Sequence, residues 1–131
     1  MKMNDVSFNF TGKTVVVTGG SRGIGLEVVK SFINSGAVVY CLSRTDPNID
    51  GCYHIGCNLR NQLSIKLAFD SIETVDFLIN VAGTNLCCPI EDIDSDEWDR
   101  VMSTNLKSFY YTSKLAVEIM KQKNFGRIVN V

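Results

Sequence analysis

The chain has 131 residues, of which 45% are hydrophobic, which is enough for one domain with a buried core and too few for two ordinary domains. Its 13 basic and 14 acidic residues give a formal net charge of -1 without a run of like charge, so nothing favours a nucleic acid or an anionic membrane as partner. The N-terminal segment has no apolar run, and the sequence predicts neither signal peptide nor membrane anchor, as in a cytoplasmic protein.

Apolar runs alternate along the chain with segments of helical periodicity. A β-branched run predicts a buried strand at 13–18, and further short runs predict strands at 37–42, 52–57, 75–83 and 127–131. Apolar residues at helical spacing predict helices at 23–36, 61–72 and roughly 95–123. Asp94 and Glu97 resemble a capping box that opens the long helix, and Gly126 is expected to end it. This alternation is typical of βαβ units, so we expect one α/β domain over residues 1–131 with a doubly wound parallel sheet.

Helical periodicity also predicts which helix faces are buried. Leu63, Leu67 and Ile72 mark the apolar face of the second helix. In the long helix, at about 100° per residue, the face around Asn105 is expected to contact the sheet. The apolar stripe on that face consists of Trp98, Val101, Met102, Phe109, Thr112, Ala116, Ile119 and Met120. Asn105 is thus a polar amide within a buried stripe, where it needs hydrogen-bond partners.

The segment TGGSRGIG, residues 18–25, joins the first predicted strand to the first predicted helix. Gly19, Gly23 and Gly25 permit a tight turn, close approach of a pyrophosphate to the backbone, and close packing of the helix, whose N-terminus faces the anion. Ligands of doubly wound sheets bind at the carboxyl ends of the strands, near the point where the strand order reverses. The glycine turn lies at that point, so the sequence predicts a dinucleotide site there.

The spacing of this turn, T-G-x-x-x-G-x-G, resembles that of the short-chain dehydrogenase/reductase family. Further matches follow in register: GCNLR at 56–60, NVAG at 80–83, EWDRVMSTN at 97–105 and GRIVNV at 126–131. The resemblance extends from about Phe10 to the last residue. It implies a Rossmann-like fold and hydride transfer between a nicotinamide and a small carbonyl or alcohol, as in 3-oxoacyl reductases or other carbonyl reductases. Asn58 stands where the family has Asp, and Val81 where it has a second Asn; either change can weaken a hydrogen bond.

The resemblance also implies roles for individual residues. Asn105 corresponds to the family's catalytic Asn, which helps to hold a water in a proton relay. Family members are commonly homo-oligomers built partly on the long helix. The residues expected to bind the cofactor are Gly19, Ser21, Arg22, Gly23, Ile24, Gly25, Ser43, Arg44, Asn58, Leu59, Asn80, Ala82 and Gly83.

The end of the second predicted strand favours NADP(H) over NAD(H). NAD-preferring proteins usually place an acid there, which accepts hydrogen bonds from the ribose hydroxyls and would repel a 2'-phosphate. This chain has Ser43 and Arg44 at that place, and Arg22 lies in the glycine turn. Two guanidinium groups are therefore expected to hold the 2'-phosphate.

Tyr110 and Lys114 have the Tyr-x-x-x-Lys spacing of a proton-transfer pair. Helical phase places them about 140° and 180° from Asn105, beside Arg100 and Lys107, so we interpret them as outward residues. In the family the catalytic Ser and Tyr-x-x-x-Lys follow the segment that matches 126–131, so this chain alone is expected to be inactive. One face of strands four and five is then expected to be uncovered, with strand five an open edge. A non-catalytic dinucleotide-binding module and an interaction fragment stay as alternatives.

The chain has five cysteines, which a non-secreted protein normally keeps reduced. Cys52, His54 and Cys57 lie close together in the sequence, but they lack the paired spacing and the second cluster of a metal site. We predict no metal and interpret these cysteines as small buried residues.

Overall fold

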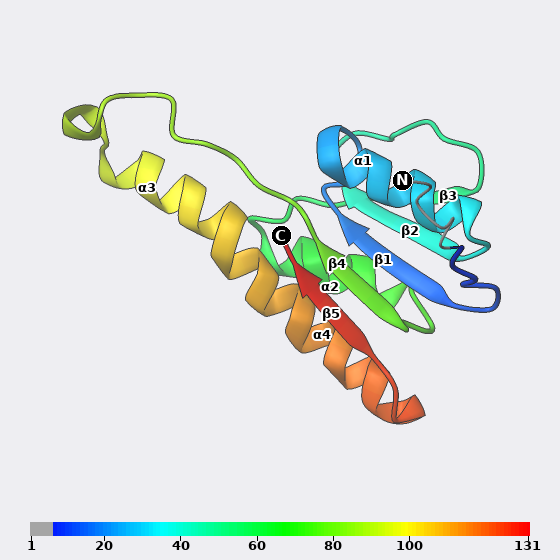
Figure 1. Ribbon diagram of the computed structural model, residues 1–131. Helices are drawn as coiled ribbons and strands as arrows, with labels where there is room; N and C mark the ends of the chain where they lie inside the picture. The colour runs from blue at the N-terminus through cyan, green and yellow to red at the C-terminus, as the bar shows by residue number, and fades with distance from the viewer. Residues whose placement is uncertain (1–6) are drawn as a thin grey trace, which may run out of the picture.

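The computed structural model describes residues 7–131, which form a five-stranded parallel sheet with helices on both faces (Figure 1). The strands are β1 (Thr14–Thr18), β2 (Val38–Ser43), β3 (Cys52–Gly56), β4 (Phe77–Asn80) and β5 (Arg127–Asn130). They lie in the order β3-β2-β1-β4-β5, and every pair of neighbours is parallel. The predicted α/β, doubly wound sheet is therefore confirmed, and the strand order reverses at β1.

The prediction about the N-terminal segment rests partly on residues 1–6, which lie outside the described residues. Over the part of the chain that the structure describes, every helix is too short or too polar to cross a membrane.

Helix α1 (Gly23–Asn34) covers one face of the sheet, and α2 (Gln62–Asp70) and α4 (Ser108–Lys123) cover the other (Figure 1). The central strand β1 contributes residues to the hydrophobic cores on both faces of the sheet, because alternate residues of a strand point to opposite faces. Val15 and Val17 pack on the α1 side, whereas Val16 packs with the residues of α2 and α4. Burial on both faces explains why β1 reads as a continuous apolar run in the sequence.

The predicted buried face of α2 is wrong for two of its residues. Leu63 and Leu67 are exposed, and the helix instead buries Ile65, Ala68 and Phe69. Both sets have helical spacing, so periodicity alone does not choose between them. The set that contains the aromatic ring packs against the sheet, beside the buried Ala116 of α4.

The long helix consists of α3 (Ser95–Met102), a π-helical turn (Ser103–Lys107) and α4. A π turn bonds each residue to the fifth one along, so it shifts the helical phase relative to a regular α-helix. The predicted stripe is confirmed in α4, where Thr112, Ala116 and Met120 are buried. In α3 it is wrong for Trp98, which is 55% exposed, whereas Val101 and Met102 are half-buried.

The ends of this helix were predicted with partial success. Asp94 caps α3, because its carboxylate accepts a hydrogen bond from the Glu97 N–H at 2.8 Å. The Glu97 side chain is bonded to Arg100 instead of returning to Asp94, so the reciprocal half of the capping box is not formed. At the other end Asn124, in the left-handed conformation with φ of 53°, terminates α4 in place of the predicted Gly126.

The expected uncovered sheet face is present only on β5. Leu78 and Ile79 of β4 are buried, one in each core, so the prediction was wrong for this strand. On β5, Val129 is 48% exposed, and the strand is hydrogen-bonded to β4 alone among the described strands. The prediction that strand five is an edge is thus confirmed.

Candidate functional site

A cleft of about 750 Å³ opens at the carboxyl ends of β1 to β4. Its wall contains twelve residues that the sequence predicted: Gly19, Ser21, Arg22, Gly23, Ile24, Gly25, Ser43, Arg44, Asn58, Leu59, Ala82 and Gly83. It also contains residues that the sequence reasoning missed, namely Thr45, Cys57, Arg60, Val81, Thr84, Arg100, Thr104 and Val131. The topology therefore brings four separate loops together at one edge of the sheet, as expected for a ligand site of a doubly wound fold.

The glycine turn leaves no room for a side chain at Gly19 and Gly25, where backbone atoms are in the way. A Cβ atom at Gly25 would lie 2.3 Å from the carbonyl oxygen of Gly19, and one at Gly19 would lie 2.7 Å from the Cα of Ala82. Gly23 differs, since its φ is 56° and a Cβ there would meet open space. Gly19 and Gly25 thus allow α1 and the loop after β4 to pack closely against the turn, while Gly23 leaves backbone exposed toward the cleft.

The N-terminus of α1 is free to bind an anion. Its N-cap residue, Arg22, has extended backbone and no side-chain hydrogen bond to the helix, and the first turn contains no acidic residue. The first N–H groups of a helix have no partner within it, and the helix dipole adds partial positive charge there. Because Gly23, Ile24 and Gly25 line the cleft, these groups lie where a phosphate can reach them.

The cleft wall is strongly basic. Four arginines line it and no aspartate or glutamate does, among the residues that the structure describes. Arg22, Arg44 and Arg60 have no side-chain hydrogen bond or ion pair within residues 7–131 and are exposed. Unpaired guanidinium groups around a concave surface attract anions and suit bidentate binding of phosphate.

Arg100, the fourth arginine, was predicted on the outward face, and this is wrong. It lines the cleft and forms an ion pair with Glu97, with contacts of 2.6 and 2.8 Å. These hydrogen bonds hold the pKa of the Glu97 carboxyl below its usual value. The phase shift at the π turn is the physical reason, because α3 is rotated relative to the continuous helix that the prediction assumed.

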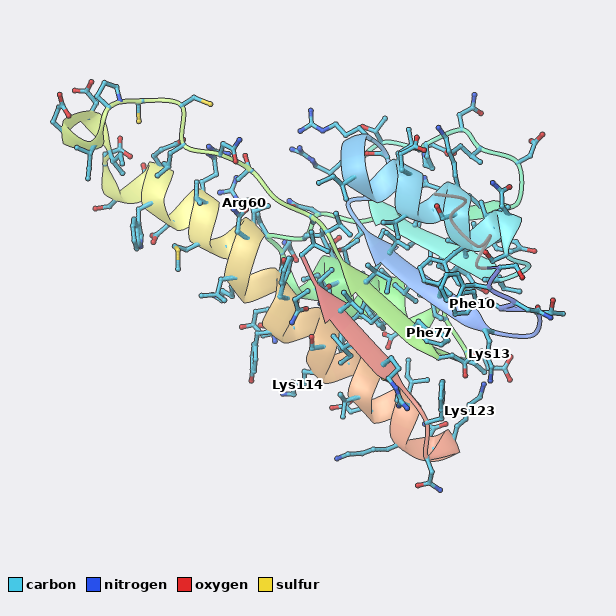
Figure 2. All side chains as sticks on the ribbon, viewed as in Figure 1. Phe10, Lys13, Arg60, Phe77, Lys114 and Lys123 are labelled. Atoms are coloured by element: carbon cyan, nitrogen blue, oxygen red, sulfur yellow. The ribbon has the colours of Figure 1, made fainter. Side chains whose placement is uncertain are left out.

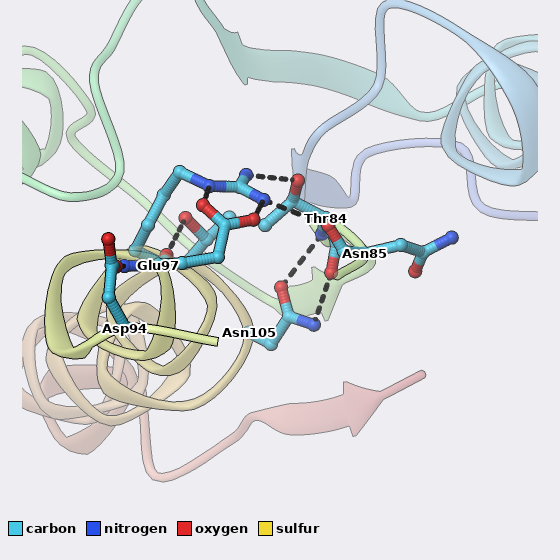
Figure 3. A network of polar contacts seen from close by, with 7 residues as sticks. Thr84, Asn85, Asp94, Glu97 and Asn105 are labelled. Carbon is cyan, nitrogen blue, oxygen red and sulfur yellow. Dashed lines mark hydrogen bonds and ion pairs between the residues drawn. The ribbon is translucent and has the colours of Figure 1, made fainter. Parts of the chain in front are cut away.

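Asn105 lies in the π turn, and its side chain has the hydrogen-bond partners that a buried amide needs. Its Oδ1 accepts from the Thr84 N–H, and its Nδ2 donates to the Thr84 carbonyl, both at 2.8 Å (Figure 3). The side chain is half-buried and lies behind the cleft wall, not in it. Asn105 therefore fixes the loop after β4, and a role in proton transfer stays a prediction.

Asn80 was predicted to bind the cofactor, but it is fully buried and does not line the cleft. Its Nδ2 donates to the Asn130 Oδ1 at 2.9 Å, and its Oδ1 accepts from the Thr112 hydroxyl at 2.8 Å. A weaker contact of 3.4 Å joins it to Ser113. Asn80 thus links β4 to β5 and α4, and it supports the edge of the cleft from inside.

We expect Asn80→Ala to lower the free energy of unfolding by about 1–3 kcal/mol, because buried partners such as Thr112 lose their hydrogen bond. Urea unfolding followed by circular dichroism measures this change. Ser113→Ala serves as control, and its cost should be below about 0.5 kcal/mol. Equal stabilities of wild type and Asn80→Ala would show that the network contributes nothing.

Tyr110 and Lys114 lie on the outward side of α4, as predicted. Tyr110 is 61% exposed, and Lys114 points away from the sheet (Figure 2). Neither residue lines the cleft. Their spacing is helical, but the structure does not bring them to the candidate site.

The cysteines are free thiols in different environments. Cys41 and Cys57 are buried, Cys52 is half-buried, and Cys87 and Cys88 are exposed. The interpretation as small buried residues thus holds fully for Cys57 and partly for Cys52. Within residues 7–131, groups of three or more side chains that could hold a metal are absent. Burial raises the pKa of the Cys41 and Cys57 thiols, and raises that of Cys52 to about 11.

These environments predict the order of thiol alkylation. Iodoacetamide reacts with the thiolate, so at pH 8 Cys87 and Cys88 should be labelled first, and the other three at least about tenfold more slowly. Peptide mass spectrometry over time checks this order. Early labelling of Cys52 would contradict the packing around β3.

The sequence and the fold are similar to those of known dehydrogenases. Residues 13–131 match the model of the family described as short chain dehydrogenase. The chain belongs to the short-chain dehydrogenase family. It is 32% identical over 136 aligned positions to D-beta-hydroxybutyrate dehydrogenase of Cupriavidus necator, a match that covers 92% of this chain and 52% of that protein.

Two solved structures of dehydrogenases have the same fold. Aldohexose dehydrogenase of Thermoplasma acidophilum superposes with a TM-score of 0.88 at 34% identity, over 92% of this chain and 49% of that one. A short chain dehydrogenase of Leptospira borgpetersenii with bound NAD+ has a TM-score of 0.88 at 32% identity, over 99% of this chain and 55% of that one. The chain thus spans about half the length of the relatives that it matches.

Proposed function

We propose that this chain is the NADP(H)-binding part of a short-chain oxidoreductase, with the dinucleotide in the cleft at the carboxyl edge of the sheet. The observation that carries the proposal is an uncapped helix N-terminus beside Gly23 in a cleft whose charged residues are all arginines. These groups fit a pyrophosphate and a further phosphate. The relative from Leptospira borgpetersenii, which has NAD+ bound, supports a nicotinamide dinucleotide as the class of ligand.

The preference for NADP(H) rests on the end of β2. Arg44 lies there in the cleft wall, and Arg22 reaches the same cleft from the glycine turn. Asp46, the first acid after the strand, is outside the wall, with a carboxylate oxygen 3.8 Å from the ring of His54. A 2'-phosphate would therefore meet guanidinium groups and no carboxylate, whereas NAD(H) would leave both arginines without an anion.

In the whole protein, the bound nicotinamide would supply or accept a hydride, with a small carbonyl or alcohol as substrate. The residues of this chain would bind the phosphates, orient the dinucleotide and hold the loop after β4 through Asn105. Among residues 7–131, no Tyr-x-x-x-Lys pair lies at the candidate site, so we propose binding without turnover for this chain by itself. The outward face of α4 is proposed as a homo-oligomer contact, and the five free thiols suit a cytosolic protein.

Calorimetric titration of the 131-residue chain with NADPH and NADH tests this proposal. We expect NADPH to bind at least about tenfold more tightly than NADH, the equivalent of one charge-assisted contact. Added carbonyl substrates should produce no oxidation of NADPH. Absence of binding heat with both dinucleotides would overturn the binding function, and tighter binding of NADH would overturn the preference.

A further inference from the structure

Thr84 is held at each of its polar groups (Figure 3). Asn105 binds both the N–H and the carbonyl of its backbone at 2.8 Å. Arg100 donates from Nη1 to the Thr84 hydroxyl at 2.7 Å and from Nη2 to the carbonyl of Asn85 at 2.8 Å. Two side chains of the long helix therefore close on the same loop residue, which directly follows the Ala82–Gly83 part of the cleft wall.

The π turn makes this convergence possible. Arg100 and Asn105 are five residues apart, and in a regular α-helix such residues point about 140° away from each other. The turn at Ser103–Lys107 bonds residues five apart, and so brings both side chains toward the loop. Short insertions of this kind are frequent at functional sites.

Glu97 fixes the direction of the Arg100 guanidinium. Its two carboxylate oxygens accept from Nε and Nη2 of Arg100, so the guanidinium is held in one plane while Nη1 and Nη2 reach the loop. Glu97 is itself placed in the first turn of α3, whose N-terminus is capped by Asp94. The guanidinium is thus oriented before any ligand binds.

We propose that Arg100, oriented by Glu97, is a positioning residue that clamps the loop Thr84–Asn85 and thereby holds Asn105 and the Ala82–Gly83 wall in place for the dinucleotide. This inference rests on the proposed function for its consequence in binding. The clamp itself is a property of the protein without ligand.

A competing role for Arg100 is simple attraction of the anionic cofactor, and Glu97→Ala separates the two. If Arg100 acts only through its charge, loss of the nearby carboxylate should tighten NADPH binding. If it acts as a clamp, loss of Glu97 frees the guanidinium and binding should weaken. Arg100→Lys gives a second separation, because lysine keeps the charge but cannot form the planar fork.

Hydrogen exchange of the Thr84 amide, measured by NMR without ligand, tests the clamp. In Arg100→Met, Arg100→Lys and Glu97→Ala we expect this exchange to be at least about tenfold faster than in wild type, since each variant removes or frees the oriented guanidinium that holds the loop. Lys107→Met removes a positive charge elsewhere on the helix and should leave it unchanged. NADPH affinity should fall about tenfold in all three of these variants, Glu97→Ala included.

Unchanged Thr84 exchange in Arg100→Met, or tighter NADPH binding by Glu97→Ala, would overturn the inference. If the Arg100 variants do not fold, two variants of Thr84 test the clamp, because Thr84→Val removes only the hydroxyl acceptor and Thr84→Ser keeps it. Faster exchange of the residue 84 amide in Thr84→Val, with wild-type exchange in Thr84→Ser, supports the clamp. Equal exchange rates in the two variants overturn it. A wild-type chain that binds no dinucleotide would contradict the proposed function, while the exchange rates would still decide the clamp.

Discussion

Gly25→Ala is expected to abolish NADPH binding and to lower the free energy of unfolding by about 3 kcal/mol. The added methyl group would lie 2.3 Å from the carbonyl oxygen of Gly19 and 2.9 Å from its carbonyl carbon, both of which are backbone atoms. Relief of this overlap requires α1 to move away from the glycine turn, which displaces the N–H groups that face the cleft. Urea unfolding and calorimetric titration with NADPH measure the two effects.

Gly56→Ala is the matched control, because a Cβ at this glycine meets no atom within 4 Å. Its stability should stay within about 0.5 kcal/mol of wild type. If Gly25→Ala behaved like this control in both assays, the close contact between α1 and the turn would have no importance for the cleft.

Arg44→Ala is expected to raise the Kd for NADPH by about ten- to a hundredfold and to change that for NADH by less than about twofold. Arg44 lies in the cleft wall at the end of β2, without a partner among residues 7–131. Its removal would deprive the 2'-phosphate of a charge-assisted hydrogen bond, a group that NADH does not have. Arg22→Ala should act in the same direction, and the double variant should lose most of the preference.

Arg127→Ala provides the control for loss of an exposed arginine. This residue lies on β5, where its guanidinium packs over the ring of Phe125, and it does not line the cleft. Its NADPH affinity should equal that of wild type. If the ratio of the Kd values for NADPH and NADH is the same in Arg44→Ala and wild type, the proposal that Arg44 binds the 2'-phosphate is refuted.

The sheet and most of the cleft could be predicted from the sequence, because both depend on local and repeated signals. Short apolar runs specify most of the strands, and the alternation with helices specifies parallel pairing. The loops that line the cleft directly follow those strands, so residues such as Gly19, Arg44 and Asn58 could be placed without knowledge of the packing. Arg60 follows Asn58 by two positions and could have been found by the same reasoning.

The residues that the sequence misplaced depend on long-range packing. Arg100 and Trp98 were wrongly oriented because a π turn, which has no periodic signal of its own, shifts the helical phase before Asn105. Asn80 ends a strand beside the cleft, but its amide is drawn inward by partners that are 32 and 50 positions later in the chain. Leu63 was assigned to the core because two helical faces of α2 carry apolar residues.

The central claim, that NADP(H) binds across the carboxyl edge of the sheet, is tested most directly by NMR mapping of the 131-residue chain during titration with NADPH. We predict amide shift changes that concentrate in the four loops of the cleft, at 19–25, 43–45, 57–60 and 81–84, with the outward face of α4 around Tyr110 unaffected. Saturating changes confined to that outward face, or no change at millimolar NADPH, would contradict the claim.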